Sequence, residues 1–223
     1  MSNKFFKNIY VERKKRLNSQ TSIDNIAVKE WVKNLNSSPL KKHKKDLSKL
    51  YVLARNLDYK NHKNLTYFSH TLRVANMSNY FQENLKLKKE LIILGLFHNI
   101  IESSNLDKNF LSWLLGKKIY NQINILTVNR KKEKNKYYIN SYYRKLYMSH
   151  KNLRIIKILD KIDNLFIIGL CENNKQRKDY INHIKKYICP MILKDTPILY
   201  EYVLGLIEDS HKLGYYNAKT FNE

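Results

Sequence analysis

Three short islands of the sequence contain side chains that could together bind a metal ion and activate water. They read YFSHTLRVANM, LFHNIIESS and KILDKIDNL, and their candidate ligands and acid–base groups are His70, His98, Asn99, Glu102, Asp160, Asp163 and Asn164. Imidazole and carboxylate groups are the usual ligands of divalent transition metals, and a metal-dependent hydrolase needs several of them converging from different helices. The islands therefore predict a hydrolytic metal site.

Spacing within the islands supports this interpretation. His98 and Glu102 are four residues apart, as are Asp160 and Asn164, so each pair is expected to share one face of a helix. Both pairs interrupt otherwise apolar helical patterns, where polar groups need partners or a position at a cleft.

The elements that position these residues are predicted to be helices. Leu87, Leu91, Leu94, His98 and Ile101 recur at steps of three or four, which is typical of one continuous helix. With only five Gly and three Pro in 223 residues, long helices are favoured over many short strands. Further helices are expected at 107–115, 117–127, 138–148, 152–169, 175–189 and 197–212. The predicted fold class is all-α, with ten or so helices in one compact domain.

The net charge of +23 indicates an anionic partner without identifying one. Such a field attracts nucleotides, pyrophosphates, nucleic acid or an anionic membrane surface. Codon drift in an AT-rich genome is an equal alternative, because Lys, Asn, Ile and Tyr are all abundant. The runs KKHKK and NRKKEKNK are interpreted as solvated surface, with nucleic-acid contact the less favoured alternative.

Nothing in the sequence resembles a leader peptide or a membrane span. Cys171 and Cys189 lack the spacing of a redox or zinc motif and are expected to be reduced thiols. We therefore expect a cytoplasmic protein that does not associate with membranes.

The three islands together resemble the HD superfamily, and within it the hydrolase domain of RelA/SpoT proteins and its small stand-alone relatives. YFSH matches the first histidine of the family pattern, FHNIIESS matches His-Asp-x-x-Glu-Asp, and KILDKIDN matches the late K-L-A-D-[RK]-x-x-N motif. The resemblance spans about 46–210. It implies a phosphohydrolase-like HD domain at 46–215, and the charge and residue pattern before it predict a basic N-terminal arm and helix at 1–45.

The resemblance also implies a chemistry. A divalent ion, usually Mn²⁺ in the family, would be bound by His70, His98, Asn99 and Asp160. Glu102 would be the catalytic residue, and the substrate-binding residues would be Lys161, Asn164 and Lys60. The implied reaction is hydrolysis of a nucleotide phosphoester or pyrophosphate, above all the 3′-pyrophosphate of guanosine tetraphosphate (ppGpp).

Two departures from the pattern keep alternatives open. Asn99 replaces a metal-binding aspartate, and Ser103 replaces the second acidic residue of the Glu-Asp pair. An amide oxygen carries no charge, so weaker metal binding is expected. A pseudoenzyme that binds a nucleotide without turnover, or a basic helical nucleic-acid-binding protein, are the alternatives. Asp163 is expected to face solvent or a lysine, and the histidines outside the islands are expected to be surface groups: His43, His62, His150, His183 and His211.

Overall fold

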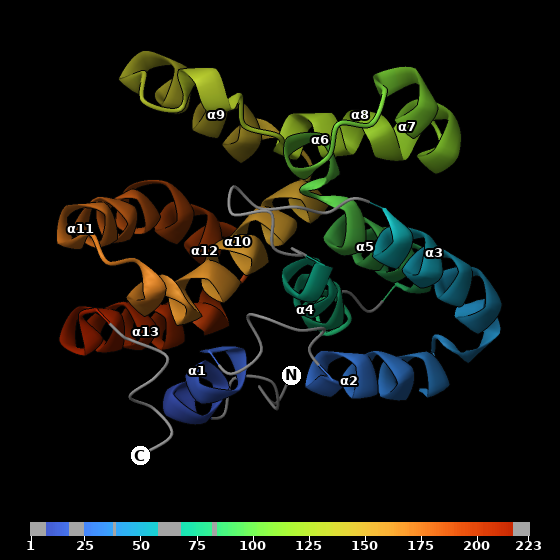
Figure 1. Ribbon diagram of the computed structural model, residues 1–223, viewed down its shortest axis with the longest axis horizontal. Coiled ribbons are helices and arrows are strands. Elements are labelled where there is room, and N and C mark those ends of the chain that lie inside the picture. Colours follow the sequence, from blue (N-terminus) through green and yellow to red (C-terminus); the bar gives the residue numbers. More distant parts are fainter. Residues whose placement is uncertain (1–7, 18–24, 38, 58–67, 82–83, 216–223) are drawn as a thin grey trace. The chain divides into compact units, whose positions relative to one another are not determined.

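The predicted all-α class is confirmed, because the described residues form helices and turns and contain no strand. The computed structural model describes residues 8–17, 25–37, 39–57, 68–81 and 84–215 (Figure 1). Packing divides the chain into two units. We call residues 22–156 the first unit, and residues 1–21 together with 157–223 the second unit.

The unit of residues 22–156 contains eight α-helices in its described part. They are α2 (Asn25–Asn36), α3 (Lys44–Asn56), α4 (Phe68–Ser78), α5 (Leu85–Phe97), α6 (Ile100–Ser103), α7 (Lys108–Leu115), α8 (Lys117–Leu126) and α9 (Lys136–Met148). Single 3₁₀ turns at Lys41–His43 and Arg130–Lys132 precede α3 and α9. Helix α10 (Lys151–Phe166) begins in this unit and continues without interruption into the other.

The other unit combines the N-terminal helix with the C-terminal part of the chain. Its further elements are α1 (Ile9–Leu17), a 3₁₀ turn (Ile168–Leu170), α11 (Asn174–His183), a π-helical turn (Ile184–Ile188), α12 (Cys189–Asp195), a 3₁₀ turn (Pro197–Leu199) and α13 (Tyr200–Leu213). The structure is therefore helical over the predicted range 175–189, but residues Ile184–Ile188 form a π-helical turn and not a continuation of the α-helix.

Helices α4 and α5, both in the unit of residues 22–156, lie side by side and pack extensively against each other (Figure 1). All eleven residues of α4 are buried. Gly95 of α5 makes this approach possible, because a Cβ atom there would lie 2.7 Å from the Ala75 Cα and 2.9 Å from the Ala75 nitrogen. Since Cβ atoms do not approach backbone this closely, any larger residue would push the two helices apart.

The prediction of one continuous helix through His98 and Ile101 is wrong, because the helix is interrupted at His98 and Asn99. Helix α5 ends at Phe97, His98 and Asn99 form a turn, and the short helix α6 begins at Ile100. The Asn99 carbonyl accepts hydrogen bonds from the Glu102 and Ser103 amides at 3.0 and 2.9 Å. The apolar periodicity continues across this turn, which is why the sequence pattern does not reveal it.

The predicted N-terminal arm also contains structure, since residues 9–17 form α1. Its buried face includes the guanidinium groups of Arg13 and Arg16. Such a face has no apolar rhythm, because long arginine side chains replace the usual aliphatic residues. The helix was therefore not recognisable from hydrophobic spacing.

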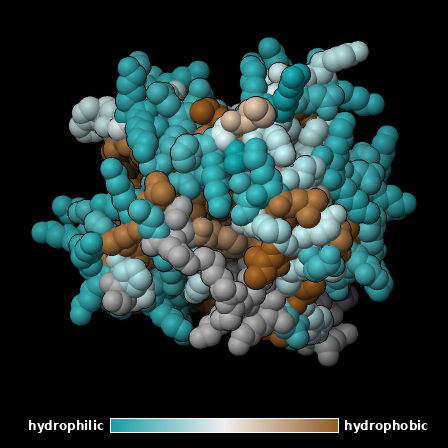
Figure 2. All heavy atoms as spheres, turned by 180° about the vertical axis from the view of Figure 1, so that it is seen from behind, coloured by the Kyte–Doolittle hydropathy of each residue, from teal (hydrophilic) through white to brown (hydrophobic). Residues whose placement is uncertain are grey.

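The surface is strongly polar. Figure 2 shows one face, on which hydrophilic side chains cover most of the coloured area and apolar side chains gather in smaller patches. None of the helices in the described ranges has the length and apolar character required to cross a membrane.

Candidate metal centre

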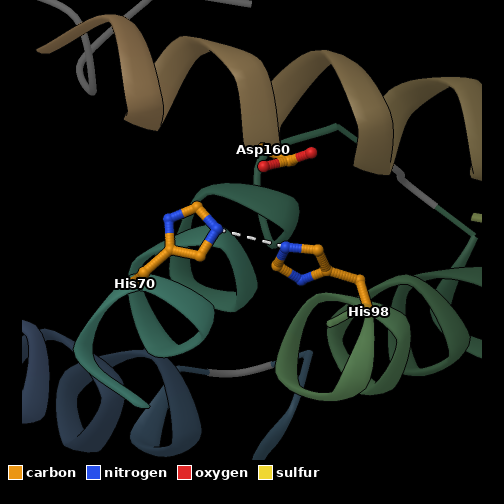
Figure 3. Close-up of side chains that lie close together, drawn as sticks. All are labelled: His70, His98 and Asp160. Atoms are coloured by element: carbon orange, nitrogen blue, oxygen red, sulfur yellow. Dashed lines mark hydrogen bonds between the residues drawn. The ribbon is translucent and has the colours of Figure 1, made fainter. Parts of the chain in front are cut away.

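Two buried histidines of the first unit approach each other across the α4–α5 pair. His70 lies in the first turn of α4, and His98 directly follows α5. Their Nε2 atoms are 3.2 Å apart, and the residues are 3% and 1% exposed. Both rings direct these nitrogens toward one point (Figure 3). Two buried imidazoles in this arrangement are typical of metal ligands.

The backbone fixes the orientation of the His98 ring. Its Nδ1 atom lies 2.8 Å from the Gly95 carbonyl oxygen, so Nδ1–H donates to that carbonyl. In a neutral imidazole the lone pair is then on Nε2, the atom that faces His70. Metal-ligating histidines are commonly oriented by such a bond from the second ring nitrogen. Gly95 therefore contributes both the close helix approach and this carbonyl.

Asp160 of α10 is the third member of the group. One ligand atom from each of His70, His98 and Asp160 lies within 4.8 Å of the other two, and all three residues are buried (Figure 3). Ligands about 2.1 Å from one ion and separated by an angle of roughly 100° are about 3.2 Å apart, as the two imidazole nitrogens are. The donor set and its spacing therefore fit a divalent metal ion.

Positive charge surrounds the Asp160 carboxylate. The ammonium groups of Lys157 and Lys161 both lie 3.3 Å from its Oδ2 atom. The amide nitrogen of Asn164 donates to its Oδ1 atom at 2.7 Å, which confirms that residues 160 and 164 share a helical face. Two cations around a single carboxylate make this region favourable for a phosphate group and less favourable for a cation.

Asn99 lies next to His98 in the turn before α6 and is buried. Its carbonyl oxygen also accepts a hydrogen bond from the Ser103 hydroxyl at 2.6 Å. The serine that replaces an acidic residue thus stabilises the turn that carries His98 and Asn99.

The Glu102 carboxylate is held by the segment that follows α8. Its Oε1 atom accepts a hydrogen bond from the Val128 amide at 2.7 Å, and its Oε2 atom pairs with Arg130 at 2.7 Å. Glu102 is not a member of the metal-ligand group found among the described residues. Because the helix breaks at His98, the expected common helical face of His98 and Glu102 does not exist.

The expectation that Asp163 faces solvent is wrong, and the partner found for it among the described residues is an arginine. The Asp163 side chain is fully buried, and its Oδ1 atom accepts a hydrogen bond from Arg16 Nε at 2.7 Å. Arg13 of the same helix donates to the carbonyl oxygens of Leu165 and Phe166 at 3.0 and 2.7 Å. Helix α1 therefore holds the C-terminal end of α10, a few residues beyond Asp160.

His183 was expected at the surface but is half-buried. It lies near Lys157 and Lys161, the two lysines that flank Asp160. Burial lowers its pKa to about 4, assisted by the positive charges of Lys161, Lys157 and Lys186, while Asp160 acts in the opposite direction. It also stacks on Tyr180, with ring centroids 6.5 Å apart. The sequence contains no motif that marks His183, because it lies outside the three islands.

Lys60, the remaining predicted substrate ligand, lies outside the described residues.

The part of the chain that contains the three metal-ligand candidates matches a known domain family. The sequence profile described as "HD domain" matches residues 67–165, a range that contains all three metal-ligand candidates. A search among curated proteins gives no match.

One similar solved structure is described as a metazoan ortholog of SpoT that hydrolyzes ppGpp and plays a role in starvation responses. It superimposes with a TM-score of 0.57 at 14% sequence identity, over 73% of this chain and 93% of the other. At this identity the similarity concerns the fold.

Proposed function

We propose that this chain, whose residues 67–165 match the HD domain profile, is a metal-dependent phosphohydrolase that hydrolyses a phosphoester or pyrophosphate bond of a nucleotide. Among nucleotides we propose ppGpp, with its 3′-pyrophosphate as the group removed. The ppGpp hydrolysis described for the structural neighbour supports this choice.

The observation that carries the proposal is the buried group of His70, His98 and Asp160, with its two imidazole nitrogens 3.2 Å apart. We propose Asn99, adjacent to His98, as a further and uncharged ligand of the metal. A divalent ion, Mn²⁺ in our proposal, would supply Lewis-acid chemistry by acidifying water and polarising the phosphoryl group.

The remaining proposed roles belong to side chains around this group. Lys161, 18% exposed at its side chain, would offset negative charge on the phosphate oxygens. Asn164 donates to the Asp160 carboxylate at 2.7 Å, and in our proposal its amide would also contact the substrate. Glu102 would accept the proton of the attacking water after its carboxylate is oriented by the Val128 amide. Lys60 is proposed as an additional phosphate ligand.

Metal binding is the first test. Isothermal titration of the purified chain with Mn²⁺ should show one site, and His98→Ala should abolish it. His150→Ala, which removes an exposed histidine, is the matched control and should bind normally. Asn99→Asp should tighten binding, because it restores a charged ligand. Unchanged binding in Asn99→Asp would exclude residue 99 from the ligand set.

Turnover is the second test. Metal-loaded protein should release pyrophosphate from ppGpp, and Glu102→Gln should reduce the rate by about 10²-fold or more without reducing metal affinity. Anion-exchange separation of guanosine nucleotides measures the product directly. Equal rates for wild type and Glu102→Gln would refute the assignment of Glu102 as the proton acceptor.

A catalytically weakened nucleotide-binding protein is the second candidate. The observation that favours it is the charge around Asp160, where two lysines accompany the single carboxylate of the metal-ligand group. In that case metal-loaded protein would bind a guanosine polyphosphate in equilibrium dialysis and return it unchanged.

A further inference from the structure

The region between α8 and α10 concentrates positive charge on the surface of the first unit. Residues 128–151 contain eight lysines and arginines and one glutamate, a net charge of +7 in 24 residues against +23 in the whole 223-residue chain. The region therefore carries a larger share of the net charge than its length alone would give it.

These cations are exposed, and Arg130 is the one among them that forms ion pairs in the described part of the chain. Every residue of 130–137 is exposed, and Glu133, the one acidic residue, pairs with Arg130. Within the described ranges no ion pair involves the other cations of this region that precede α10, which are Lys131, Lys132, Lys134, Lys136, Arg144 and Lys145. We refer to these six residues together with Tyr137 as the basic surface.

Helix α9 determines which side chains this surface presents. Its inner face buries Tyr142, Tyr143 and Leu146, and the Tyr142 hydroxyl donates to the Leu126 carbonyl at 2.6 Å. The opposite face therefore points to solvent and carries Arg144 and Lys145. Tyr137 at its beginning is 89% exposed, which leaves both faces of its ring accessible.

We propose that the basic surface binds single-stranded nucleic acid. Cations that track a phosphate backbone, combined with exposed aromatic rings on which unpaired bases stack, form the typical surface for this ligand. A lipid bilayer fits less well, because a helix that lies on a membrane inserts its apolar face, and the apolar face of α9 is already packed inside the protein. This surface is distinct from the metal centre and does not depend on the proposed hydrolysis.

The test uses the full chain and a fluorescein-labelled oligothymidylate of about 20 nucleotides, with binding followed by fluorescence anisotropy. Affinity should fall as NaCl rises from roughly 50 to 200 mM. The triple change Lys131→Ala, Lys132→Ala, Lys134→Ala should reduce the slope of log K against log [NaCl] by about 2, since each lost phosphate contact on a single strand contributes about 0.7. Arg130 is left unchanged because it holds Glu102.

Two variants isolate the surface from general charge. Lys41→Ala, Lys42→Ala, Lys45→Ala removes the same charge from exposed positions near the start of α3 and should leave the slope unchanged. Tyr137→Ala should weaken binding about tenfold through loss of stacking, and Tyr137→Phe should retain it. His98→Ala should bind the oligonucleotide normally, even though it lacks the metal site.

Several outcomes would overturn the proposal. Equal losses in the two lysine triples would assign the effect to diffuse charge. Loss of oligonucleotide binding in His98→Ala would place the ligand at the metal centre instead. Binding to phosphatidylserine vesicles, without binding to the oligonucleotide, would identify an anionic membrane as the partner.

Discussion

Two carboxylates, each three residues beyond a proposed metal ligand, are paired with arginines in very different surroundings. Asp163 follows Asp160 and accepts a hydrogen bond from Arg16, while Glu102 follows Asn99 and pairs with Arg130. Both nitrogen–oxygen distances are 2.7 Å. The Arg16 side chain is 3% exposed, however, whereas that of Arg130 is 66% exposed.

The comparison shows that two ion pairs of equal length can contribute differently to stability, depending on how exposed the arginine is. The Arg16–Asp163 pair is buried, and Arg16 also pairs with Glu12 at 2.7 Å. Removal of the guanidinium takes a cation from a carboxylate that water does not solvate, and this costs stability. In the other pair the Glu102 side chain is only 6% exposed, but water solvates the arginine and the Val128 amide also binds the carboxylate. Loss of this arginine should therefore cost little stability. We infer that Arg16 and Asp163 anchor α1 to α10, while Arg130 is a replaceable neighbour of Glu102.

The largest expected effect follows from removing Arg16. Arg16→Met leaves the Asp163 carboxylate buried without its guanidinium and should lower the free energy of unfolding by about 3–5 kcal/mol. Urea denaturation followed by circular dichroism measures this change. The double variant Arg16→Met, Asp163→Leu should recover much of the loss, because the buried carboxylate is removed together with its cation and Glu12 keeps its ion pair with Lys15. A loss below about 1 kcal/mol in the single variant would remove the distinction between the two pairs.

Gly95→Ala tests whether a change in helix packing near His98 lowers the free energy of unfolding as much as the loss of the charge partner of Asp163. The added methyl would collide with the Ala75 backbone, and we expect a loss of about 1–3 kcal/mol. Gly205→Ala is the matched control, because its Cβ would lie an ordinary 3.5 Å from Ile9. The control should be neutral or stabilising by up to about 1 kcal/mol. Equal stabilities for the two variants, measured by urea denaturation, would contradict the close α4–α5 approach.

Arg130→Met should have a smaller effect on stability than either change. We expect the free energy of unfolding to change by at most about 1 kcal/mol, because the arginine is exposed and the Val128 amide still binds Glu102. The same urea series provides the comparison with Arg16→Met. A loss as large as that of Arg16→Met would show that Glu102 depends on this partner.

The smallest effect at neutral pH concerns His183. Its folded-state pKa of about 4 lies below the ordinary 6.5, so the unfolded chain binds the proton more readily. The free energy of unfolding is therefore independent of His183 protonation above about pH 6.5. It decreases progressively as the pH falls toward 4, because the unfolded chain takes up the proton first. His183→Gln should flatten this dependence in urea midpoints measured between pH 7.5 and 4.5, whereas His150→Gln should not. Parallel curves for wild type and His183→Gln would refute the lowered pKa.

Much of the fold follows from local features of the sequence. Scarce Gly and Pro and the spacing of apolar residues predicted helices at 107–115, 117–127 and 138–148, close to the observed α7, α8 and α9. Gly116, with a φ of 79°, separates α7 from α8 at the residue where the predicted elements were divided. Such features depend only on backbone preference and nearest neighbours, and the sequence reports both directly.

The types of the metal-ligand candidates were also determined by the sequence, since His70, His98 and Asp160 were recognisable from three islands in order. Their geometry was not. The 3.2 Å approach of the imidazoles depends on how closely α4 and α5 pack, and thus on Gly95 meeting Ala75, 20 residues away in the chain. Nothing in the local pattern of Gly95 distinguishes it from any other helical glycine.

The partners of the charged residues were likewise decided by tertiary structure alone. Asp163 lies in a lysine-rich segment, and its neighbours in sequence suggested a lysine or solvent as its partner. Its actual partner, Arg16, is 147 residues away. A buried carboxylate must be satisfied by whichever cation the packed chain brings to it, because desolvation makes an unpaired charge too costly. Sequence spacing records proximity only along one helix, whereas burial and ion pairing depend on which helices meet.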